Sequence, residues 1–182
     1  MSPYGTHDGD ESYTGLLGKD RVPKSDRRIE ALGAVDECTA VLGVARTQAR
    51  SPETGKVLLH VQRDLYVLMA ELAATPENVE NFRAINENSV KWLEIAIHQF
   101  EQLVDMPEEF IVPGDSLQGA MLDVARTVIR RAERRVVELT HSGDVQNFEL
   151  VRYLNRASNL CYVLELYENS LAGQARPTLA KG

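Results

Sequence analysis

Apolar side chains recur every three or four residues through most of the chain, and this period predicts helices. Five helices are expected, at about residues 25–51, 52–75, 87–105, 116–141 and 146–172. Ser25 or Asp26 can cap the first helix, and Pro76 stops the second. The fourth has the clearest stripe, with the 3-4-3-4-3 spacing of a bundle seam, and Gly143 follows it as a C-terminal stop. The pattern predicts an all-α five-helix bundle.

The same pattern predicts which side chains form the core. In the first helix the side chains expected to face inward are Ile29, Leu32, Val35, Ala40, Leu42 and Val44. In the fourth helix they are Leu122, Ala125, Ile129, Ala132, Val136 and Leu139. No segment alternates with period two, so no strand is expected. The run FIVPG (110–114) interrupts the helical period and is expected to be a short extended connection, partly buried.

The first 24 residues differ from the rest, because they are rich in glycine and lack a hydrophobic period. Such a segment is either a disordered tail or a loop whose backbone N–H groups wrap an anion. Lys24, at the junction with the first helix, could close over phosphates or could be an ordinary solvated lysine. The P-loop motif G-x-x-x-x-G-K-[ST] is absent. We therefore expect one domain over 1–182, with a loop at 1–24, the bundle at 25–173 and a tail at 174–182.

Composition narrows the class of protein. The net charge of −7 argues against a protein that coats nucleic acid, since phosphate neutralisation needs a basic surface. No apolar run is long enough to span a membrane. Cys38 and Cys161 lie in apolar helical patterns and are expected to be buried thiols, and the histidines lack the spacing of a zinc site. A cytoplasmic, reducing location is the default expectation.

The fourth helix carries the most suggestive polar pattern. Arg126, Arg130 and Glu133 are spaced i, i+4, i+7, so they share one helical face beside the apolar seam. A guanidinium is costly to bury there unless an anion meets it. Arg126 could pair with Asp36 or Glu37 of the first helix, and Arg130 could bind phosphate. The alternative is a solvated face of weak ion pairs.

Asn155 poses a similar choice on the fifth helix. It adjoins a seam, and a buried amide needs hydrogen-bond partners. A nucleotide could supply them, or Asn155 could bridge neighbouring helices.

Four blocks, in order, resemble the PduO-type ATP:cob(I)alamin adenosyltransferases. The blocks are Arg21 to Glu37, FIVPG, Ala125 to Leu139 and Leu154 to Asn169, and the resemblance runs over most of the chain. It implies a five-helix bundle that assembles as a homotrimer, with ATP bound between adjacent subunits by a glycine-rich N-terminal loop. It also implies transfer of the 5′-deoxyadenosyl group of ATP to the cobalt of cob(I)alamin, with release of triphosphate. The substrates are then ATP with Mg²⁺ and cobalamin. A reductase and an adenosylcobalamin-dependent enzyme are the expected protein partners, without nucleic acid or membrane.

The resemblance also assigns roles to residues. Arg130 and Glu133 would be catalytic, and Phe110 would displace the lower axial ligand of the corrin. The residues implied to bind ATP are Thr6, Gly9, Asp10, Thr14, Lys24, Arg130, Arg131, Glu133, Arg134 and Asn155. Asp36 and Arg126 would form an ion pair between subunits. No protein side chain is assigned to Mg²⁺, which would arrive with ATP.

Five positions depart from the family pattern. His7, Asp8 and Ser12 stand where the family loop reads arginine, threonine and glycine. Asp115 replaces the second glycine of L-P-G-G, and Asp123 replaces a common histidine. Besides the enzyme, two other functions stay open: a non-catalytic module that senses ATP or delivers adenosylcobalamin, and a purely structural helical assembly.

Overall fold

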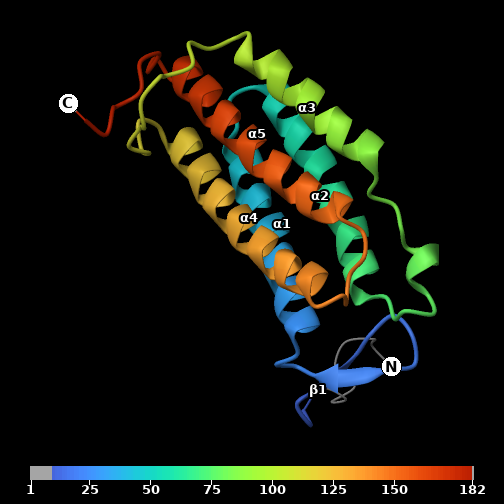
Figure 1. Cartoon of the computed structure of the whole chain (residues 1–182). Coiled ribbons are helices and arrows are strands. Elements are labelled where there is room, and N and C mark those ends of the chain that lie inside the picture. The colour runs from blue at the N-terminus through green and yellow to red at the C-terminus, as the bar shows by residue number, and fades with distance from the viewer. Residues whose placement is uncertain (1–9, 182) are drawn as a thin grey trace.

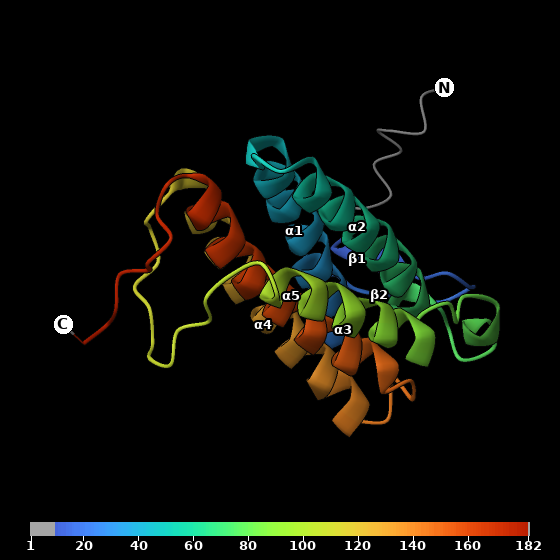
Figure 2. The ribbon, with the colours of Figure 1, turned by 90° about the horizontal axis from the view of Figure 1, so that it is seen from above.

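Five α-helices form a bundle in the computed structural model, which describes residues 10–181 (Figure 1). The helices are α1 (Arg27–Gln48), α2 (Pro52–Ala73), α3 (Glu87–Glu101), α4 (Leu117–His141) and α5 (Glu149–Leu171), with a short 3₁₀ helix η1 (Val79–Asn81) before α3. α5 packs against α3 and α4, and α1 packs against α2 and α4 (Figure 2). The predicted bundle is confirmed.

The helix ends follow local capping chemistry. The Asp26 side chain accepts the Arg28 backbone N–H at 2.8 Å, so Asp26 rather than Ser25 caps α1. Ser116 caps α4 by accepting the Gly119 backbone N–H at 3.0 Å. Gly143 takes a positive φ of 82°, which ends that helix. α3 ends at Glu101, one turn before the predicted end, so the connection to α4 is longer than expected.

The core is built from the predicted seams, except for two residues of α1. All six residues of the α4 stripe are at most 1% exposed. In α1, Val35 and Leu42 are buried, but Ala40 and Val44 are exposed, so their inward assignment is wrong. The buried face of α1 runs through Ala31, Val35, Cys38, Leu42 and Ala45. Ala40 and Val44 fall outside that stripe and lie on the exposed surface of the helix.

The expectation of no strand is also wrong. β1 (Tyr13–Gly15) pairs antiparallel with β2 (Arg21–Pro23), with Thr14 opposite Val22. Strands of three residues are too short for alternation to be visible in the sequence. Their pairing depends on a turn in which the Leu16 N–H donates to the Asp20 carbonyl at 3.0 Å. A bridge between Leu17 and Ala74 attaches the hairpin to the end of α2.

Two predictions from composition can be compared with the structure. Cys38 and Cys161 are buried free thiols, and burial raises the pKa of each to about 12. They are therefore core side chains, as expected. Among residues 10–181, no helix is both long enough and apolar enough to cross a membrane.

Candidate functional site

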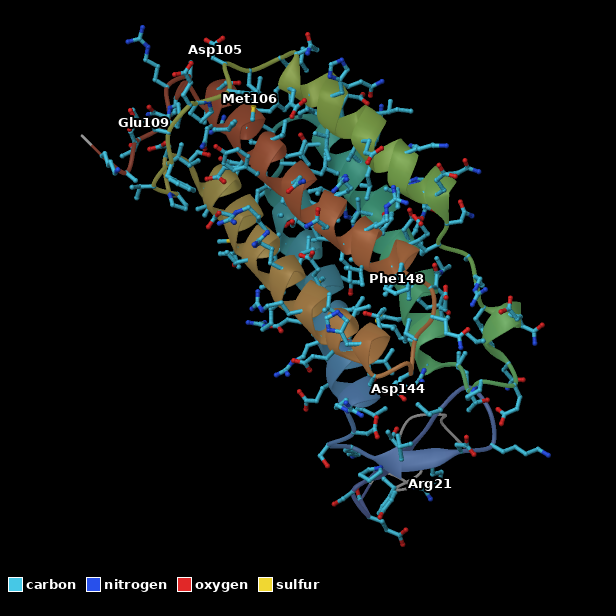
Figure 3. The ribbon with its side chains drawn as sticks, viewed as in Figure 1. Arg21, Asp105, Met106, Glu109, Asp144 and Phe148 are labelled. Atoms are coloured by element: carbon cyan, nitrogen blue, oxygen red, sulfur yellow. The ribbon has the colours of Figure 1, made fainter. Side chains whose placement is uncertain are left out.

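A cleft of about 560 Å³ opens beside α3, α4, α5 and the connection 102–116. Its lining residues come from those four segments: Ile97, Glu101, Met106, Glu108, Glu109, Phe110, Ile111, Pro113, Asp123, Arg126, Arg130, Ser158, Asn159, Tyr162 and Val163. Met106 and Glu109 mark the connection at the end of the bundle where the C-terminal segment also lies (Figure 3). An apolar cleft with a few convergent charged groups is the usual form of a small-molecule site.

Three predicted site residues meet in this cleft. Phe110, Arg126 and Arg130 all line it. In the sequence Phe110 precedes α4, whereas the two arginines lie within that helix. The Phe110 side chain is 88% exposed, which is unusual for a large aromatic side chain. A free aromatic ring at the rim of an apolar cleft is available to contact a ligand.

Arg126 lines the cleft and is paired within its own helix. Its Nε donates to Asp123 Oδ1 at 2.7 Å, and both side chains are half-buried. Asp36 is exposed, and no ion pair to it is found in residues 10–181. Within a single chain Arg126 therefore pairs with Asp123, not with Asp36 or Glu37. A pairing of Arg126 with Asp36 between subunits stays a prediction.

Glu165 of α5 is an acidic residue that the sequence analysis missed. It is fully buried, and neither carboxyl oxygen has a hydrogen-bond partner among the described residues. Burial raises the pKa of its carboxyl to about 7, and the negative charge of Asp123 adds to the rise while Arg126 opposes it. The sequence did contain a signal for its burial, because Glu165 follows Cys161 by four residues and so lies on the same inward face of α5.

Glu133 and Asn155 form a second group, which links α4 to α5. The Asn155 Nδ2–H donates to Glu133 Oε1 at 3.0 Å, and Arg156 donates to Asn155 Oδ1 at 2.7 Å. Arg156 also donates to Glu94 of α3 at 2.9 Å. In the isolated chain Asn155 therefore bridges helices, which is one of the two alternatives that the sequence left open. These hydrogen bonds fix the orientation of the Asn155 amide, with its nitrogen toward Glu133 and its oxygen toward Arg156.

The arginines that surround Glu133 divide between two sides of α4. No hydrogen bond or ion pair of the Arg130 guanidinium is found in the described part of the chain, so it is an available cation in the cleft lining. Arg134 donates to the Arg130 carbonyl at 3.0 Å and so stays near it. Arg131 forms an ion pair with Glu37 of α1 and is not brought together with the others. Its assignment to ATP finds no support within one chain.

The predicted residues of the N-terminal loop lie at the other end of the bundle. Arg21 and Asp144 mark that end in Figure 3, opposite Met106 and Glu109. Arg130 precedes the end of α4, His141, by eleven residues, which is about 16 Å along a helix. Within one chain, Thr14 and Lys24 of the hairpin are therefore separated from Arg130 and its neighbours.

The hairpin has one strained residue. Ser12 takes a φ of 65°, in the left-handed region that favours glycine, and its carbonyl accepts the Lys24 N–H at 2.8 Å. Asp10 and Lys24 are exposed and Thr14 is half-buried. The predicted positions Thr6, His7, Asp8 and Gly9 lie outside the described residues.

Comparison with known proteins gives a consistent result. A family model for cobalamin adenosyltransferase matches residues 4–168. The chain is 37% identical over 170 residues to the corrinoid adenosyltransferase PduO of Citrobacter freundii, covering 93% of this chain and 50% of that protein. It is 34% identical to another corrinoid adenosyltransferase of Citrobacter freundii, covering 91% of this chain and 94% of that protein. The chain thus spans about half the length of the PduO proteins it matches.

Solved structures agree. A variant of a PduO-type ATP:corrinoid adenosyltransferase from Lactobacillus reuteri, complexed with cobalamin and ATP, superposes with a TM-score of 0.89 and 31% identity over 98% of this chain and 99% of that one. Another variant of that enzyme, complexed with ATP, superposes with a TM-score of 0.87 and 30% sequence identity. The match covers 97% of this chain and 99% of that one.

Proposed function

Because the chain belongs to the cobalamin adenosyltransferase family, we propose that it transfers the 5′-deoxyadenosyl group of ATP to the cobalt of cob(I)alamin and releases triphosphate. One observation carries the proposal: a single cleft is lined by an exposed aromatic ring, Phe110, and by an available cation, Arg130. The ring suits a large apolar macrocycle, and the guanidinium suits a phosphate.

The reaction asks the protein for alignment and for charge stabilisation. The electron pair of Co(I) forms a bond to the 5′ carbon of ATP, and the C5′–O bond breaks as triphosphate leaves with its electron pair. The cobalt supplies the nucleophile, so no protein base is needed. Arg130 would stabilise the charge that develops on the leaving triphosphate, with Arg134 beside it.

Glu133 and Asn155 would define the nucleotide position. Their hydrogen bond holds the Asn155 amide, whose carbonyl already accepts from Arg156, so the group is oriented before ATP arrives. Mg²⁺ would enter as part of the ATP substrate, held by triphosphate oxygens, with Glu133 alongside the nucleotide. No dedicated protein ligand set for Mg²⁺ is proposed.

Phe110 would act on the corrinoid. Its ring would take the place of the lower axial ligand, leaving a four-coordinate Co(II) corrinoid that is easier to reduce. The electron for Co(I) would come from a reductase, and the adenosylated product would pass to an adenosylcobalamin-dependent enzyme.

The separation between the hairpin and Arg130 favours a site shared by two subunits. Lys24 and Thr14 lie at the opposite end of the bundle from the cleft that Arg130 of their own chain lines, but the loop of one subunit could meet Arg130 of the next. We propose a homotrimer, joined in part by an ion pair from Asp36 to Arg126 of a neighbouring chain. The exposed apolar side chains of Val44 on α1 and of Val124 on α4, two helices that pack together, supply a surface for that assembly.

An anaerobic assay tests the activity. Protein mixed with chemically reduced cobalamin and Mg-ATP should convert the cob(I)alamin spectrum to that of adenosylcobalamin. Arg130→Ala should lower the rate at least 100-fold while the helical circular dichroism signal is kept, because the guanidinium forms no hydrogen bond or ion pair among the described residues. Arg135→Ala, on an exposed arginine of the same helix that pairs with Glu138, is the matched control and should keep its activity.

Folded wild-type protein that produces no adenosylcobalamin would refute the proposed transfer. Tight binding of ATP and cobalamin without turnover would instead identify the non-catalytic module.

A further inference from the structure

We propose that the C-terminal segment 177–181 holds Phe110 in position, and that Asp115 and Thr178 are positioning residues for the corrinoid. The inference rests on the proposed function, because it concerns the placement of the residue that would contact the corrin. Its evidence is a set of hydrogen bonds at Phe110 and at the residues that follow it, none of which the proposed reaction uses.

Two backbone hydrogen bonds fasten the Phe110 segment to the C-terminal segment. The Ala180 N–H donates to the Phe110 carbonyl at 2.7 Å, and the Val112 N–H donates to the Thr178 carbonyl at 2.8 Å. Between them, Ile111 and Leu179 form an antiparallel bridge. The carbonyl of Phe110 itself is thereby fixed, so the backbone that carries the ring cannot swing without breaking a bond.

The Asp115 carboxylate adds a side-chain connection next to this bridge. Its Oδ2 accepts the Thr178 N–H at 2.9 Å, and its Oδ1 accepts the Thr178 O–H at 2.7 Å. Hydrogen bonds to an ionised carboxylate are stronger than those between neutral groups. Asp115 stands where the resemblance places a glycine, which has no side chain to make this contact. The departure at Asp115 is therefore explained as an anchor for the C-terminal segment.

The anchor is attached to a rigid part of the bundle. Ser116, the next residue, caps α4, and its hydroxyl donates to the Asn169 amide oxygen of α5 at 2.5 Å. Asn169 is 1% exposed. Asp115 therefore directly precedes a residue that is bonded to both α4 and α5. Its hydrogen bonds restrict the position of Thr178, and the Ile111–Leu179 bridge in turn restricts the backbone of Phe110.

The C-terminal segment also lies next to Phe110. Phe110 lines the main cleft, and it also lines a second hollow of about 330 Å³ whose other residues include Ala180 and Lys181. Phe110 therefore borders both the cleft and the C-terminal segment, while its side chain stays 88% exposed. Phe110 lies in a long connection without helix or strand, so its backbone would otherwise have to be ordered when the ligand binds. Hydrogen bonds that already hold this backbone lower that entropy cost.

The prediction is a selective effect on the corrinoid. Without the anchor, Phe110 samples more positions, so the corrinoid should bind more weakly and be held less often in the four-coordinate state. ATP contacts other residues and should be unaffected. A general loss of structure would affect both substrates together, and this difference separates a positioning role from a merely structural one.

Thr178→Val and Thr178→Ser test the anchor in the full chain. Thr178→Val should raise the KM for the corrinoid about 3- to 10-fold, the usual effect of one lost hydrogen bond, and lower the four-coordinate Co(II) signal in absorption and electron paramagnetic resonance spectra. The KM for ATP should change less than twofold. Thr178→Ser keeps the hydroxyl and should restore wild-type values.

A proline pair tests the backbone bridge separately. Ala180→Pro deletes the N–H that donates to the Phe110 carbonyl and should act like Thr178→Val. Ala175→Pro is the matched control, because Ala175 is exposed, lies two residues before the segment, and its N–H donates in none of the hydrogen bonds found in residues 10–181. Unchanged corrinoid KM and unchanged Co(II) spectra in both Thr178→Val and Ala180→Pro would overturn the proposal. Equal losses for ATP and the corrinoid would overturn it too.

Amide hydrogen exchange separates this proposal from the proposed function. An inactive wild-type protein would refute the adenosyl transfer. The Val112 and Ala180 amides should still exchange at least about threefold faster in Thr178→Val than in Thr178→Ser if the anchor exists. Equal exchange in the two variants would refute the anchor, whatever the activity.

Discussion

Replacing Glu165 by glutamine should make the protein more stable at alkaline pH and nearly unchanged at acidic pH. Glu165 is fully buried, its carboxyl oxygens have no hydrogen-bond partner among the described residues, and burial beside Asp123 raises its pKa to about 7. Glutamine keeps the shape of the protonated side chain and cannot ionise. The variant therefore removes the charged state alone.

The size and sign follow from proton linkage. Between pH 4.5 and about 7 the native protein binds a proton at Glu165 that the unfolded chain has released, so the free energy of unfolding falls as the pH rises through this window. A rise in pKa from 4.5 to about 7 corresponds to a loss of about 3 kcal/mol, complete above the native pKa. At pH 8 Glu165→Gln should therefore unfold about 6–12 °C higher than the wild type.

Thermal and urea unfolding at pH 5, 6, 7 and 8, at one protein concentration, measures the effect. Glu168→Gln is the matched control, one turn further along α5 and equally buried. Its carboxylate accepts the Arg50 N–H at 2.8 Å and the Ser51 N–H at 3.2 Å, so its loss should cost about 1–2 kcal/mol. The two identical substitutions should thus change stability in opposite directions at pH 8. A wild-type pH slope retained in Glu165→Gln would refute the assignment of the slope to this residue.

Three further substitutions test separate parts of the structure. Asp36→Asn removes the negative charge of the proposed intersubunit ion pair and should weaken each interface by about 2 kcal/mol, seen as dissociation in sedimentation experiments; an unchanged assembly would exclude the pair. Ser12→Gly relieves a φ of 65° and should be more stable than Ser12→Ala by up to about 1 kcal/mol in thermal unfolding, whereas equal stability would mean that the backbone there is unstrained. Gly119→Ala would place a methyl group 2.1 Å from the Asn169 amide oxygen and should cost about 2–3 kcal/mol in urea unfolding, while Gly55→Ala, with open space around it, should cost nothing; equal results would contradict the close packing of α4 on α5.

Local patterns were sufficient to predict the bundle. The cap of α1, the glycine stop after α4 and the inward stripe of α4 depend on residues within one or two turns of each other, and these are visible in the sequence. Ala40 and Val44 were misassigned because an apolar residue on a helix can face either the core or the surface, and the choice is made by the helices that pack on it.

The missed features all depend on contacts between distant residues. The β1–β2 hairpin is stabilised by pairing across a turn, and Glu165 is buried by α4, which lies far from it in sequence. The contact of Asp115 with Thr178 joins positions 63 residues apart. Helical spacing placed Arg130 on one face of α4 with Arg126, and both line the cleft; that the Arg130 guanidinium is unpaired among the described residues is visible only in the structure.

The distance between the hairpin and Arg130 has a consequence for mixed assemblies. In the proposed trimer each ATP site takes its loop from one chain and its arginine from another, so a subunit with Lys24→Ala and a subunit with Arg130→Ala are defective in different halves of a site. When the two inactive proteins are unfolded together and refolded in equal amounts, random assembly should rebuild about a quarter of the sites with both halves intact. Activity would then arise from a mixture of two inactive proteins, as in complementation between alleles, and a chain that contained its whole site could not show it.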